Sequence, residues 1–286
     1  MATSRDIKRR IKSVKNMQQI TKAMKMTSAV KLRKASAAVI QVRPYLNKIE
    51  EVTAHLSKSG VKHPYLKERE VKKTAYLIFV ADRGLCGSSN NNVLRLAENH
   101  INQNPNPVGI ITIGLKARDY FVRRKFTLDD QYNYIGDVPT YTQIKGLVSK
   151  VSRSFDEGIY DEVYVVYNRF RSTISHLPTI KKILPIQPNL LADKQEDKHK
   201  YVDYIFEPDA QIILSALIPQ YVEVAIYNAL IEAKASEHGA RMTAMSAATD
   251  NALDMINALT LSLNRARQAA ITKEISEIVG GAAALS

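Results

Sequence analysis

The segment Ala81–Asn92, with the sequence ADRGLCGSSNNN, is the part of the chain best suited by residue type to hold a ligand. It follows an apolar stretch and precedes a helical one, which is where dinucleotide-binding folds place their phosphate-binding glycines. However, Gly84 and Gly87 have the spacing GxxG rather than GxGxxG, and no Lys-Ser or Lys-Thr pair follows as in a P-loop. The sequence therefore predicts a tight strand-to-helix turn, capped by Asn and Ser side chains, rather than a nucleotide site.

The remaining candidate catalytic residues form no recognisable constellation. Cys86 lies in the same turn, but no His is close to it in sequence, so a structural thiol is favoured over a nucleophile. His176 and His238 are isolated, and we interpret each as a core or surface histidine rather than a general base. No Cys and His residues have the spacing of metal ligands. Three acidic pairs are interpreted as solvated loop residues: Asp129-Asp130, Asp156-Glu157 and Asp161-Glu162.

The turn lies in the middle zone of the chain, residues 72–207, where strand and helix patterns alternate. Apolar strands are predicted at 74–82, 108–114, 162–170, 176–186 and 201–207, and helices at 91–102 and 142–155. Such alternation is typical of a compact α/β domain with a largely parallel sheet. The candidate turn is therefore expected at the carboxyl end of the first strand.

Both ends of the chain, residues 1–60 and 209–286, have the pattern of very long helices. Apolar residues step by three and four from Ile7 to Leu56, and a near-strict heptad runs from Met242 to Ala270. No aromatic residue occurs before Tyr45 or after Tyr227, which allows the two helices to pack closely. We predict that they form a long antiparallel coiled coil that projects from the α/β domain. Such a shape suits a lever, a spacer or a shaft.

The heptad of the N-terminal helix fails between Met17 and Ser28. Polar residues stand there at the seam positions, namely Gln18, Thr21, Lys25 and Ser28. Apolar residues instead spread around the helix, among them Met17, Ile20, Met24 and Met26. A helix with several partly apolar faces indicates that this stretch has more than one neighbour.

The N-terminal helix is strongly basic. Residues 1–34 contain eleven Lys or Arg and one Asp, so they carry a net charge of +10 out of +13 for the chain. This asymmetry favours an anionic partner, which could be a nucleic acid, a membrane surface or an acidic protein. The segment lacks an aromatic side chain to stack on a base, and its apolar stripe must be covered by protein. An acidic protein partner therefore fits best.

Two other function classes stay open at this point. A basic coiled-coil adaptor for nucleic acid would bind DNA with a steep dependence on salt concentration. An enzyme of the Rossmann type would bind a dinucleotide tightly. As for location, no uninterrupted apolar run approaches the roughly 20 residues of a membrane span. The N-terminus lacks the apolar core of a secretory signal, and the single Cys86 fits a reducing compartment.

Four segments resemble the gamma subunit family of rotary ATP synthases, and the likeness extends over the whole chain. They are ITKAMKM at Ile20–Met26, DRGLCG at Asp82–Gly87, ASEHGARMTAMSAATDNA at Ala235–Ala252 and NRARQAAITKEISEIVGGAAAL at Asn264–Leu285. The resemblance implies an α/β fold in which an antiparallel coiled coil of the N- and C-terminal helices accompanies a Rossmann-like domain.

The resemblance also implies a mechanical function. In the family the coiled coil enters a hexamer of three alpha and three beta subunits, while its foot rests on the membrane ring of c subunits and holds epsilon. Proton flow turns the ring and the shaft, whose asymmetry changes the catalytic sites of the beta subunits. Mg-ATP and Mg-ADP bind to alpha and beta, so no cofactor and no nucleic acid is expected on this chain. The expected place is the cytoplasmic side of a bacterial plasma membrane, as a peripheral protein.

Individual contacts carry over by motif. The resemblance implies that Met24, Lys22 and Lys25 face an acidic segment of beta, and that Arg241, Arg267, Gln268 and Thr272 contact the hexamer. It implies that Tyr204 and Glu207, in the sequence DYIFEPD, touch the c ring. From the heptad, Arg267 and Gln268 follow the seam residue Ala266 and are expected to face outward.

Overall fold

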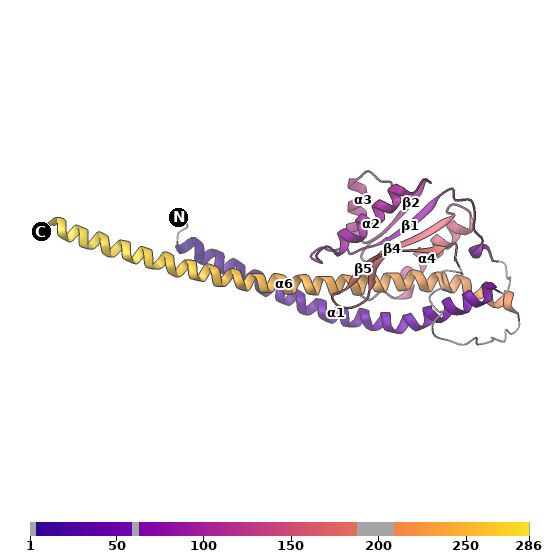
Figure 1. Cartoon of the computed structure of the whole chain (residues 1–286), viewed down its shortest axis with the longest axis horizontal. Coiled ribbons are helices and arrows are strands. Elements are labelled where there is room, and N and C mark those ends of the chain that lie inside the picture. Colours follow the sequence, from indigo (N-terminus) through magenta and orange to yellow (C-terminus); the bar gives the residue numbers. More distant parts are fainter. Residues whose placement is uncertain (1–3, 59–62, 188–208, 286) are drawn as a thin grey trace. The chain divides into compact units, whose positions relative to one another are not determined.

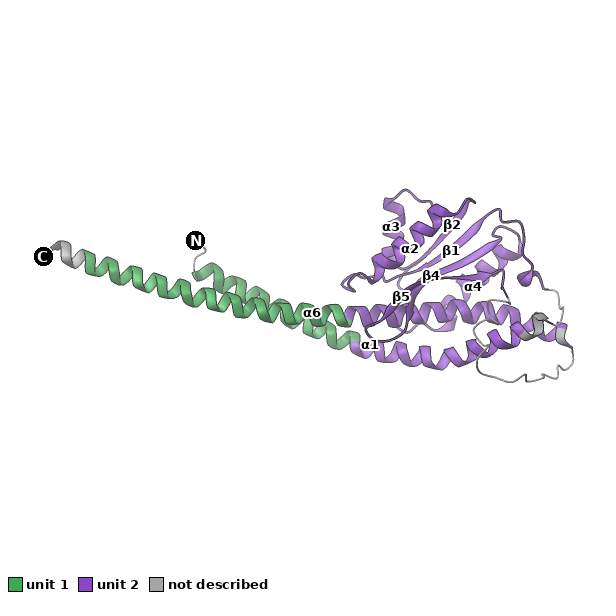
Figure 2. Ribbon diagram, viewed as in Figure 1, with its two compact units in different colours: residues 1–28, 242–286 green, residues 29–241 purple. Residues whose placement is uncertain are grey.

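The computed structural model describes residues 4–58, 63–187 and 209–285. The chain divides into two compact units (Figure 2): unit 1 comprises residues 1–28 and 242–286, and unit 2 comprises residues 29–241. In chain order the elements are α1 Ser4–Lys58, η1 Pro64–Leu66, β1 Thr74–Phe79, α2 Ser89–Gln103, β2 Val108–Ile113, α3 Leu115–Arg123, β3 Asp130–Tyr132, α4 Tyr141–Asp156, β4 Glu162–Phe170, β5 His176–Leu184 and α6 Ala210–Leu285 (Figure 1).

Unit 2 contains a five-stranded sheet in the order β3-β2-β1-β4-β5. The first four strands in this order are parallel, and β5 pairs antiparallel with β4 at the edge. The prediction of a largely parallel sheet in an α/β fold is thus confirmed. Two short elements, α3 and the three-residue strand β3, were not predicted from the sequence. The predicted strand at 201–207 lies outside the described residues.

Both faces of the sheet are covered because side chains alternate along each strand. On one face, Ala75, Leu77 and Phe79 of β1 belong to a core cluster that also contains residues of α1, α4 and α6. On the other face, Tyr76 and Ile78 pack with residues of α2 and α3. The early part of α6 is therefore a core helix of the α/β unit.

The apolar periodicity of the long helices corresponds to buried positions in unit 2. On α1 these are Leu32, Ala35, Val39, Leu46 and Ile49, and on α6 they run from Leu214 to Ala235. By length and composition, α6 contains a stretch that could cross a membrane, although the sequence contains no uninterrupted apolar run of that length. The early part of α6 places Leu214, Ile218, Val222 and Ile226 in the core of unit 2, as a core helix does.

Unit 1 is the antiparallel pairing of the start of α1 with the later part of α6. Ile7 on α1 and Met245, Ala252 and Ile256 on α6 are buried, which confirms the predicted seam. Of the four polar seam positions of α1, Thr21 and Ser28 are also buried, exposing 5% and 3% of their surface, whereas Gln18 is half-buried and Lys25 is exposed. Figure 2 shows that α6 continues beyond the first described turn of α1. Ala270, predicted as a seam residue, is accordingly exposed, because α1 offers no partner there.

Candidate functional site

The turn that follows β1 is held by hydrogen bonds at the carboxyl edge of the sheet. Asp82 Oδ1 accepts from the backbone N–H of Leu115, at 3.0 Å, and of Tyr134, at 3.2 Å. Ala81 donates its N–H to Asn90 Oδ1 at 3.2 Å. Asp82 thus places its own carboxylate at the start of α3, where a helix N-terminus attracts anions. The predicted turn is confirmed, and its Asn contributes as expected, whereas Ser88 makes no capping bond through its side chain.

The backbone of this turn is strained at its apex. Leu85 has φ of 61° and Gly87 has φ of 59°, both in the left-handed region. Leu85 pays about 1 kcal/mol for this conformation because its Cβ crowds the backbone, yet its side chain is 62% exposed. Cys86, by contrast with Leu85, is buried, with 2% of its surface exposed. This burial raises the pKa of its thiol. Cys86 is therefore a structural thiol that anchors the turn from inside.

α6 contacts the carboxyl end of β4, next to the position where a dinucleotide binds in folds of this type. Strand order reverses between β1 and β4, and ligands of open α/β sheets bind outside the carboxyl ends of the strands at that point. Asn168 of β4 donates to the backbone oxygen and to Oγ of Ser89, at 3.0 and 2.8 Å. Ser236 of α6 donates to the Asn168 backbone oxygen at 2.9 Å. Through these bonds α6 connects to β4, and Asn168 of β4 connects in turn to the first residue of α2.

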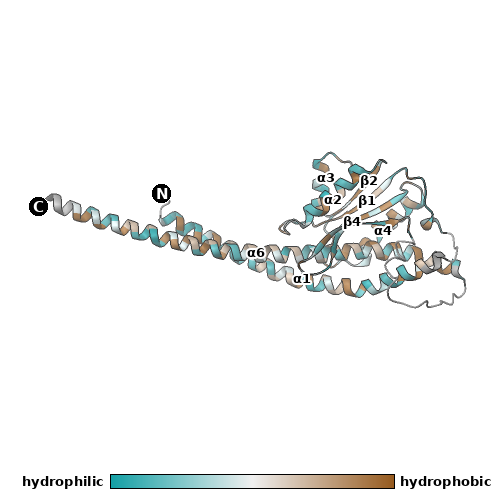
Figure 3. Ribbon diagram, viewed as in Figure 1, coloured by the Kyte–Doolittle hydropathy of each residue, from teal (hydrophilic) through white to brown (hydrophobic). Residues whose placement is uncertain are grey.

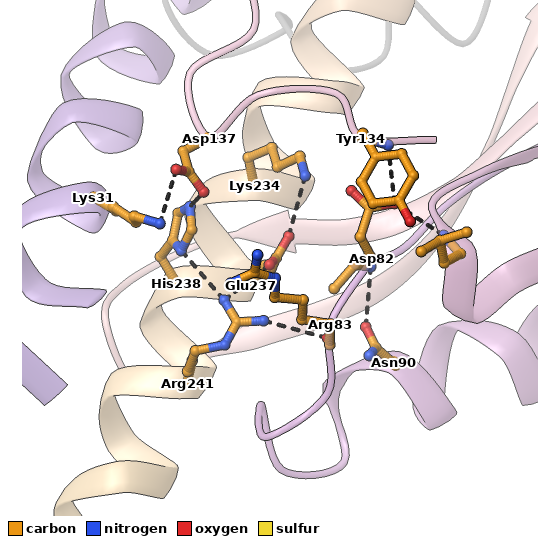
Figure 4. Close-up of polar contacts among 12 residues, drawn as sticks. Lys31, Asp82, Arg83, Asn90, Tyr134, Asp137, Lys234, Glu237, His238 and Arg241 are labelled. Carbon is orange, nitrogen blue, oxygen red and sulfur yellow. Dashed lines mark hydrogen bonds and ion pairs between the residues drawn. The ribbon is translucent and has the colours of Figure 1, made fainter. Parts of the chain in front are cut away.

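Arg241 of α6 binds the turn directly (Figure 4). Its Nε and Nη2 donate to the Gly84 carbonyl oxygen and Nη2 also reaches the Arg83 carbonyl oxygen, all at 3.3 Å. Its Nη1 pairs with Glu237 Oε1 at 2.8 Å. Arg241 exposes 9% of its surface. The residue implied as a hexamer contact is thus engaged, at all three nitrogens, inside unit 2.

Glu237 is the charge that balances this arginine. Its side chain is 12% exposed and lies 3.4 Å from Lys234 Nζ as well as beside Arg241. Burial alone would raise the pKa of Glu237, but the charges of Lys234 and Arg241 outweigh it and hold the pKa below its ordinary value. The carboxylate therefore stays ionised, and Arg241 stays fixed in the plane that reaches the turn.

His238 extends the network to α1 (Figure 4). Its Nε2 lies 3.3 Å from Asp137 Oδ1, and Asp137 Oδ2 lies 2.9 Å from Lys31 Nζ. Arg241 Nη1 lies 3.4 Å from His238 Nδ1, so Nδ1 accepts and Nε2 carries the proton. Burial is the main cause that lowers the pKa of His238, although Glu237 and Asp137 act against it. We call these five residues, Lys31, Asp137, Glu237, His238 and Arg241, the polar clamp.

A close approach next to the clamp explains Gly239. A Cβ atom at this position would lie 2.8 Å from His176 Cε1 and 3.1 Å from the Thr173 carbonyl oxygen. Any side chain would therefore push the β4–β5 connection away from α6. His176 has a lowered pKa, caused mainly by burial, and its ring stacks on Phe170. His176 and His238 are packing and network residues, in agreement with the interpretation that neither is a general base.

Two ion pairs with buried carboxylates join the long helices to the sheet elsewhere in unit 2. Arg43 Nη2 of α1 lies 2.8 Å from Glu232 Oε1 of α6 and also donates to the Phe170 carbonyl oxygen at 3.2 Å. Lys181 of β5 pairs with Glu50 of α1 at 2.7 Å. The Glu232 and Glu50 side chains are 3% and 9% exposed. Both pairs connect elements far apart in sequence, and so they specify how the helices seat on the sheet.

Two of the acidic pairs are less solvated than predicted. Asp161 is 7% exposed and accepts hydrogen bonds from the backbone N–H groups of Lys72 and Lys73. Asp129 accepts from Tyr160 at 2.6 Å and pairs with Lys73 at 2.8 Å. The interpretation as solvated loop acids was therefore wrong for Asp161, while Asp129 is exposed but is hydrogen-bonded and ion-paired. Both residues tie together loops at the amino edge of the sheet. Among the described residues, no group of His, Cys, Asp and Glu side chains is placed to hold a metal ion.

The predicted contact residues of unit 1 stand on a hydrogen-bonded seam. Thr249 donates to Thr21 Oγ1 at 2.8 Å, and Lys25 donates to Ser246 Oγ at 2.9 Å. Lys22 and Lys25 are exposed, and Met24 is half-buried. The apolar residues Met17, Ile20 and Met26 expose more than half of their surface. The prediction that apolar residues spread around this helix is confirmed.

None of the residues that the structure describes covers the end of α6. Arg267 and Gln268 are exposed as predicted, and so is Thr272. Every residue from 271 to 280 is exposed, including Ile275 at 56% and Ile278 at 71%. Figure 3 shows that apolar and hydrophilic residues still alternate along this part of the helix. Tyr204 and Glu207, the predicted c-ring contacts, lie outside the described residues.

Sequence comparison places the chain among named proteins. A family profile described as ATP synthase matches residues 3–285. The chain is 49% identical to the ATP synthase gamma chain of Pelotomaculum thermopropionicum and 50% identical to that of Desulforamulus reducens. Each of these alignments covers 100% of both chains. The ATP synthase gamma chain of Brevibacillus brevis is 47% identical over 97% of each chain.

Solved structures show the same arrangement of elements. The central stalk and c-ring structure of the Tetrahymena thermophila mitochondrial ATP synthase contains a chain that is 27% identical, with a TM-score of 0.59. That match covers 80% of this chain and 99% of the other. A chain of the Euglena gracilis mitochondrial ATP synthase is 19% identical with a TM-score of 0.70, covering 99% and 94%. This second likeness concerns the fold alone.

Proposed function

Because this chain belongs to the ATP synthase gamma-chain family, we propose that it is the central rotor shaft of the catalytic head. In this proposal proton flow through a c ring turns the shaft, and the turning shaft changes the catalytic sites of a hexamer of alpha and beta subunits. ATP hydrolysis would turn it in reverse and pump protons. The chain itself performs no bond chemistry, and the Mg-nucleotide stays on alpha and beta.

The observation that carries this proposal is the double use of α6. Its early part is a core helix of the α/β unit, where Ile218, Val222 and Ile226 are fully buried. Its later part pairs with α1 in unit 1 and ends in a stretch that none of the described residues covers. A single helix, Ala210–Leu285, thus contributes both to the core of the α/β unit and to the helical pair of unit 1. A rotor requires this continuity.

The proposed partners follow from the surface of each part. The exposed cations Lys22 and Lys25 suit an acidic segment of beta, and they neighbour the half-buried Met24. Arg267, Gln268 and Thr272 lie on the uncovered end and suit loops of the hexamer. Tyr204 and Glu207 are proposed to touch the c ring, and the epsilon subunit is proposed to bind the same foot. The complex would sit at the cytoplasmic side of a bacterial plasma membrane, with this chain as a peripheral component.

Reconstitution with purified alpha and beta subunits of the same bacterium tests the proposal. We expect the chain to co-purify with the hexamer as one copy, to hydrolyse no ATP alone, and to increase the ATPase rate of the hexamer. The double variant Lys22→Glu/Lys25→Glu should weaken assembly, most strongly at low salt, because it reverses exposed charges. Lys145→Glu is the matched control, since Lys145 is an exposed residue of α4.

Three results would contradict the proposal. The first is a chain that does not assemble with the hexamer under any salt condition. The second is a purified chain that turns over ATP by itself at about 1–100 s⁻¹, the rate of ordinary phosphoryl-transfer enzymes. The third is DNA binding with a salt dependence of several phosphates, which would favour the nucleic-acid adaptor.

A further inference from the structure

We propose that Arg241 is a positioning residue, which holds residues 83–86 against α6 so that Leu85 is presented to the hexamer. We call residues 83–86 the 83–86 turn. This inference rests on the proposed function for its partner, but not for the positioning itself. In it, Arg241 supports rotation through the turn, and the outside contact is made by Leu85 rather than by the guanidinium.

The guanidinium of Arg241 has no nitrogen left for a partner outside the chain. Nε and Nη2 bind the carbonyl oxygens of Arg83 and Gly84, and Nη1 binds Glu237. A bidentate grip on an outside carboxylate needs two parallel N–H groups that are free. Freeing them would leave Glu237, which is 12% exposed, without its closer cation. Arg241 is thus suited to a fixed internal bond rather than to one that forms and breaks.

The 83–86 turn is a part of the chain that needs such a bond. Leu85 is held at φ of 61°, in a region that residues with a Cβ avoid, and a conformation of this kind persists only when its surroundings fix it. Arg241 fixes the two carbonyl groups immediately before Leu85. The residue immediately after Leu85 is Cys86, which is held in place by its burial at 2% exposure. Asp82 fixes the start of the turn through Leu115 and Tyr134.

A rigid turn of this kind gives Leu85 the properties of a contact residue. Its side chain is 62% exposed at the apex, and Arg83 beside it is also exposed. An apolar side chain that is already held in place loses little conformational entropy on binding, so it gains affinity from preorganisation. The exposed cation next to it suits the same acidic kind of partner that the basic face of α1 suits. The hexamer is therefore the occupant that this surface fits.

Trypsin digestion of the isolated chain tests the positioning without any partner. Cleavage after Arg83 requires the turn to open locally, so the rate reports how firmly the turn is held. Arg241→Lys keeps the charge beside Glu237 but cannot reach both carbonyl oxygens with a planar fork. We expect cleavage after Arg83 to become about tenfold faster in this variant. Arg95→Lys, which changes an exposed residue of α2, is the control and should cleave at the wild-type rate. Equal rates in Arg241→Lys and wild type would overturn the proposal.

A double-mutant cycle in the reconstituted complex tests the contact. Leu85→Ala and Arg241→Lys should each lower the hexamer-stimulated ATPase rate about fivefold, and the double variant should be no slower than Leu85→Ala alone. This non-additivity follows because Arg241 has nothing to position once the Leu85 side chain is absent. Effects that multiply, or a Leu85→Ala variant with the wild-type rate, would overturn the proposal. Failure of the wild-type chain to assemble would instead reject the proposed function, while the digestion result would stand on its own.

Discussion

Two stretches of the same helix, α6, are stabilised in opposite ways. From Leu214 to Arg241 its apolar residues form the core of unit 2, and its charged residues are paired in the polar clamp and with Arg43. From Arg267 to Gly280 every side chain is exposed, although apolar residues such as Ile275 still recur. Helical structure is thus the same in both stretches, while the packing that makes a helix stable in a protein occurs in only one.

The difference shows where the chain is complete by itself and where it is not. A helical segment of this length without tertiary packing is marginal in water. Within the exposed stretch, one ion pair at i,i+4 spacing supports the helix, between Lys273 and Glu277 at 3.5 Å. Such exposed pairs contribute only about 0.3–0.5 kcal/mol. The exposed stretch therefore needs a partner to be well ordered, whereas the buried stretch does not.

The largest expected effect comes from a matched pair of Ile→Ala substitutions on α6. Ile226 is 0% exposed and Ile275 is 56% exposed. Ile226→Ala should lower the free energy of unfolding of the isolated chain by about 3 kcal/mol, because it removes buried surface and leaves a cavity. Ile275→Ala should change it by less than about 0.5 kcal/mol. Urea unfolding followed by circular dichroism measures both, and similar losses in the two variants would remove the contrast between the stretches.

A smaller effect is expected from pH, and only in the buried stretch. The pKa of His238 is lowered in the folded chain from its ordinary 6.5, so the unfolded chain binds the proton more readily. Stability from this group is complete above pH 6.5 and falls as the pH drops below it, by at most about 1.4 kcal/mol per pH unit. Protonation would set the ring against Arg241 and Lys234, although Asp137 and Glu237 offset part of that.

The unfolding free energy of wild type and His238→Gln, measured between pH 7.5 and 5, isolates this contribution. The variant should have a shallower pH dependence in this range, because the group that titrates is gone. His176 also has a lowered pKa, so His176→Gln should reduce the slope separately. Slopes that are identical in His238→Gln and wild type would show that the clamp histidine does not titrate with folding.

The smallest effect on the isolated chain is expected at the exposed end. Arg267→Ala/Gln268→Ala should leave the free energy of unfolding within about 0.5 kcal/mol, because both residues are exposed and Ala favours the helix. In the reconstituted complex the same variant should lower the ATPase rate, since we propose that these side chains contact the hexamer. Arg265→Ala, compared with the single variant Arg267→Ala, is the control, because Arg265 is an exposed arginine that lies about 200° around the helix from Arg267. A double variant that destabilises the isolated chain would identify the pair as structural residues.

The periodicity of the sequence was sufficient for the long elements of the fold. The three- and four-residue steps of α1 and the heptad of α6 depend on which faces are buried, and this is a local property of each helix. The short strand β3 and the nine-residue α3 were missed, because three residues of DQY and a charged segment such as LKARDYFVR carry little periodic signal. Among the predicted seam residues of α6, Ala270 is exposed rather than buried. The heptad pattern continues to this residue, but the described part of α1 starts at Ser4 and does not reach it.

The polar clamp could not be predicted from the sequence. His238 looked isolated because its partner, Asp137, comes from a distant part of the chain. Lys31, the cation that pairs with Asp137, is also distant in sequence. The internal role of Arg241 was missed for the same reason, because the carbonyl groups that it binds at Arg83 and Gly84 carry no side-chain signal. The one local indication was Gly239, since a glycine inside a long helical pattern suggests a close approach. The exposure of Arg267 needed only the helical spacing, whereas its proposed contact with the hexamer came from the family resemblance.

The hydrogen bond between Lys25 and Ser246 joins residues separated by 221 positions. During synthesis on the ribosome, the nascent α1 must wait for its partner for roughly 10–45 s at 5–20 residues per second. Meanwhile its apolar stripe, which includes Ile7 and Ile11, is exposed to other nascent chains. The net charge of +10 on residues 1–34 then acts as a safeguard, because like charges keep such segments apart. Because the two ends of the chain pair with each other, the apolar stripe at the start of α1 remains an aggregation risk until the last residues of the chain are synthesised.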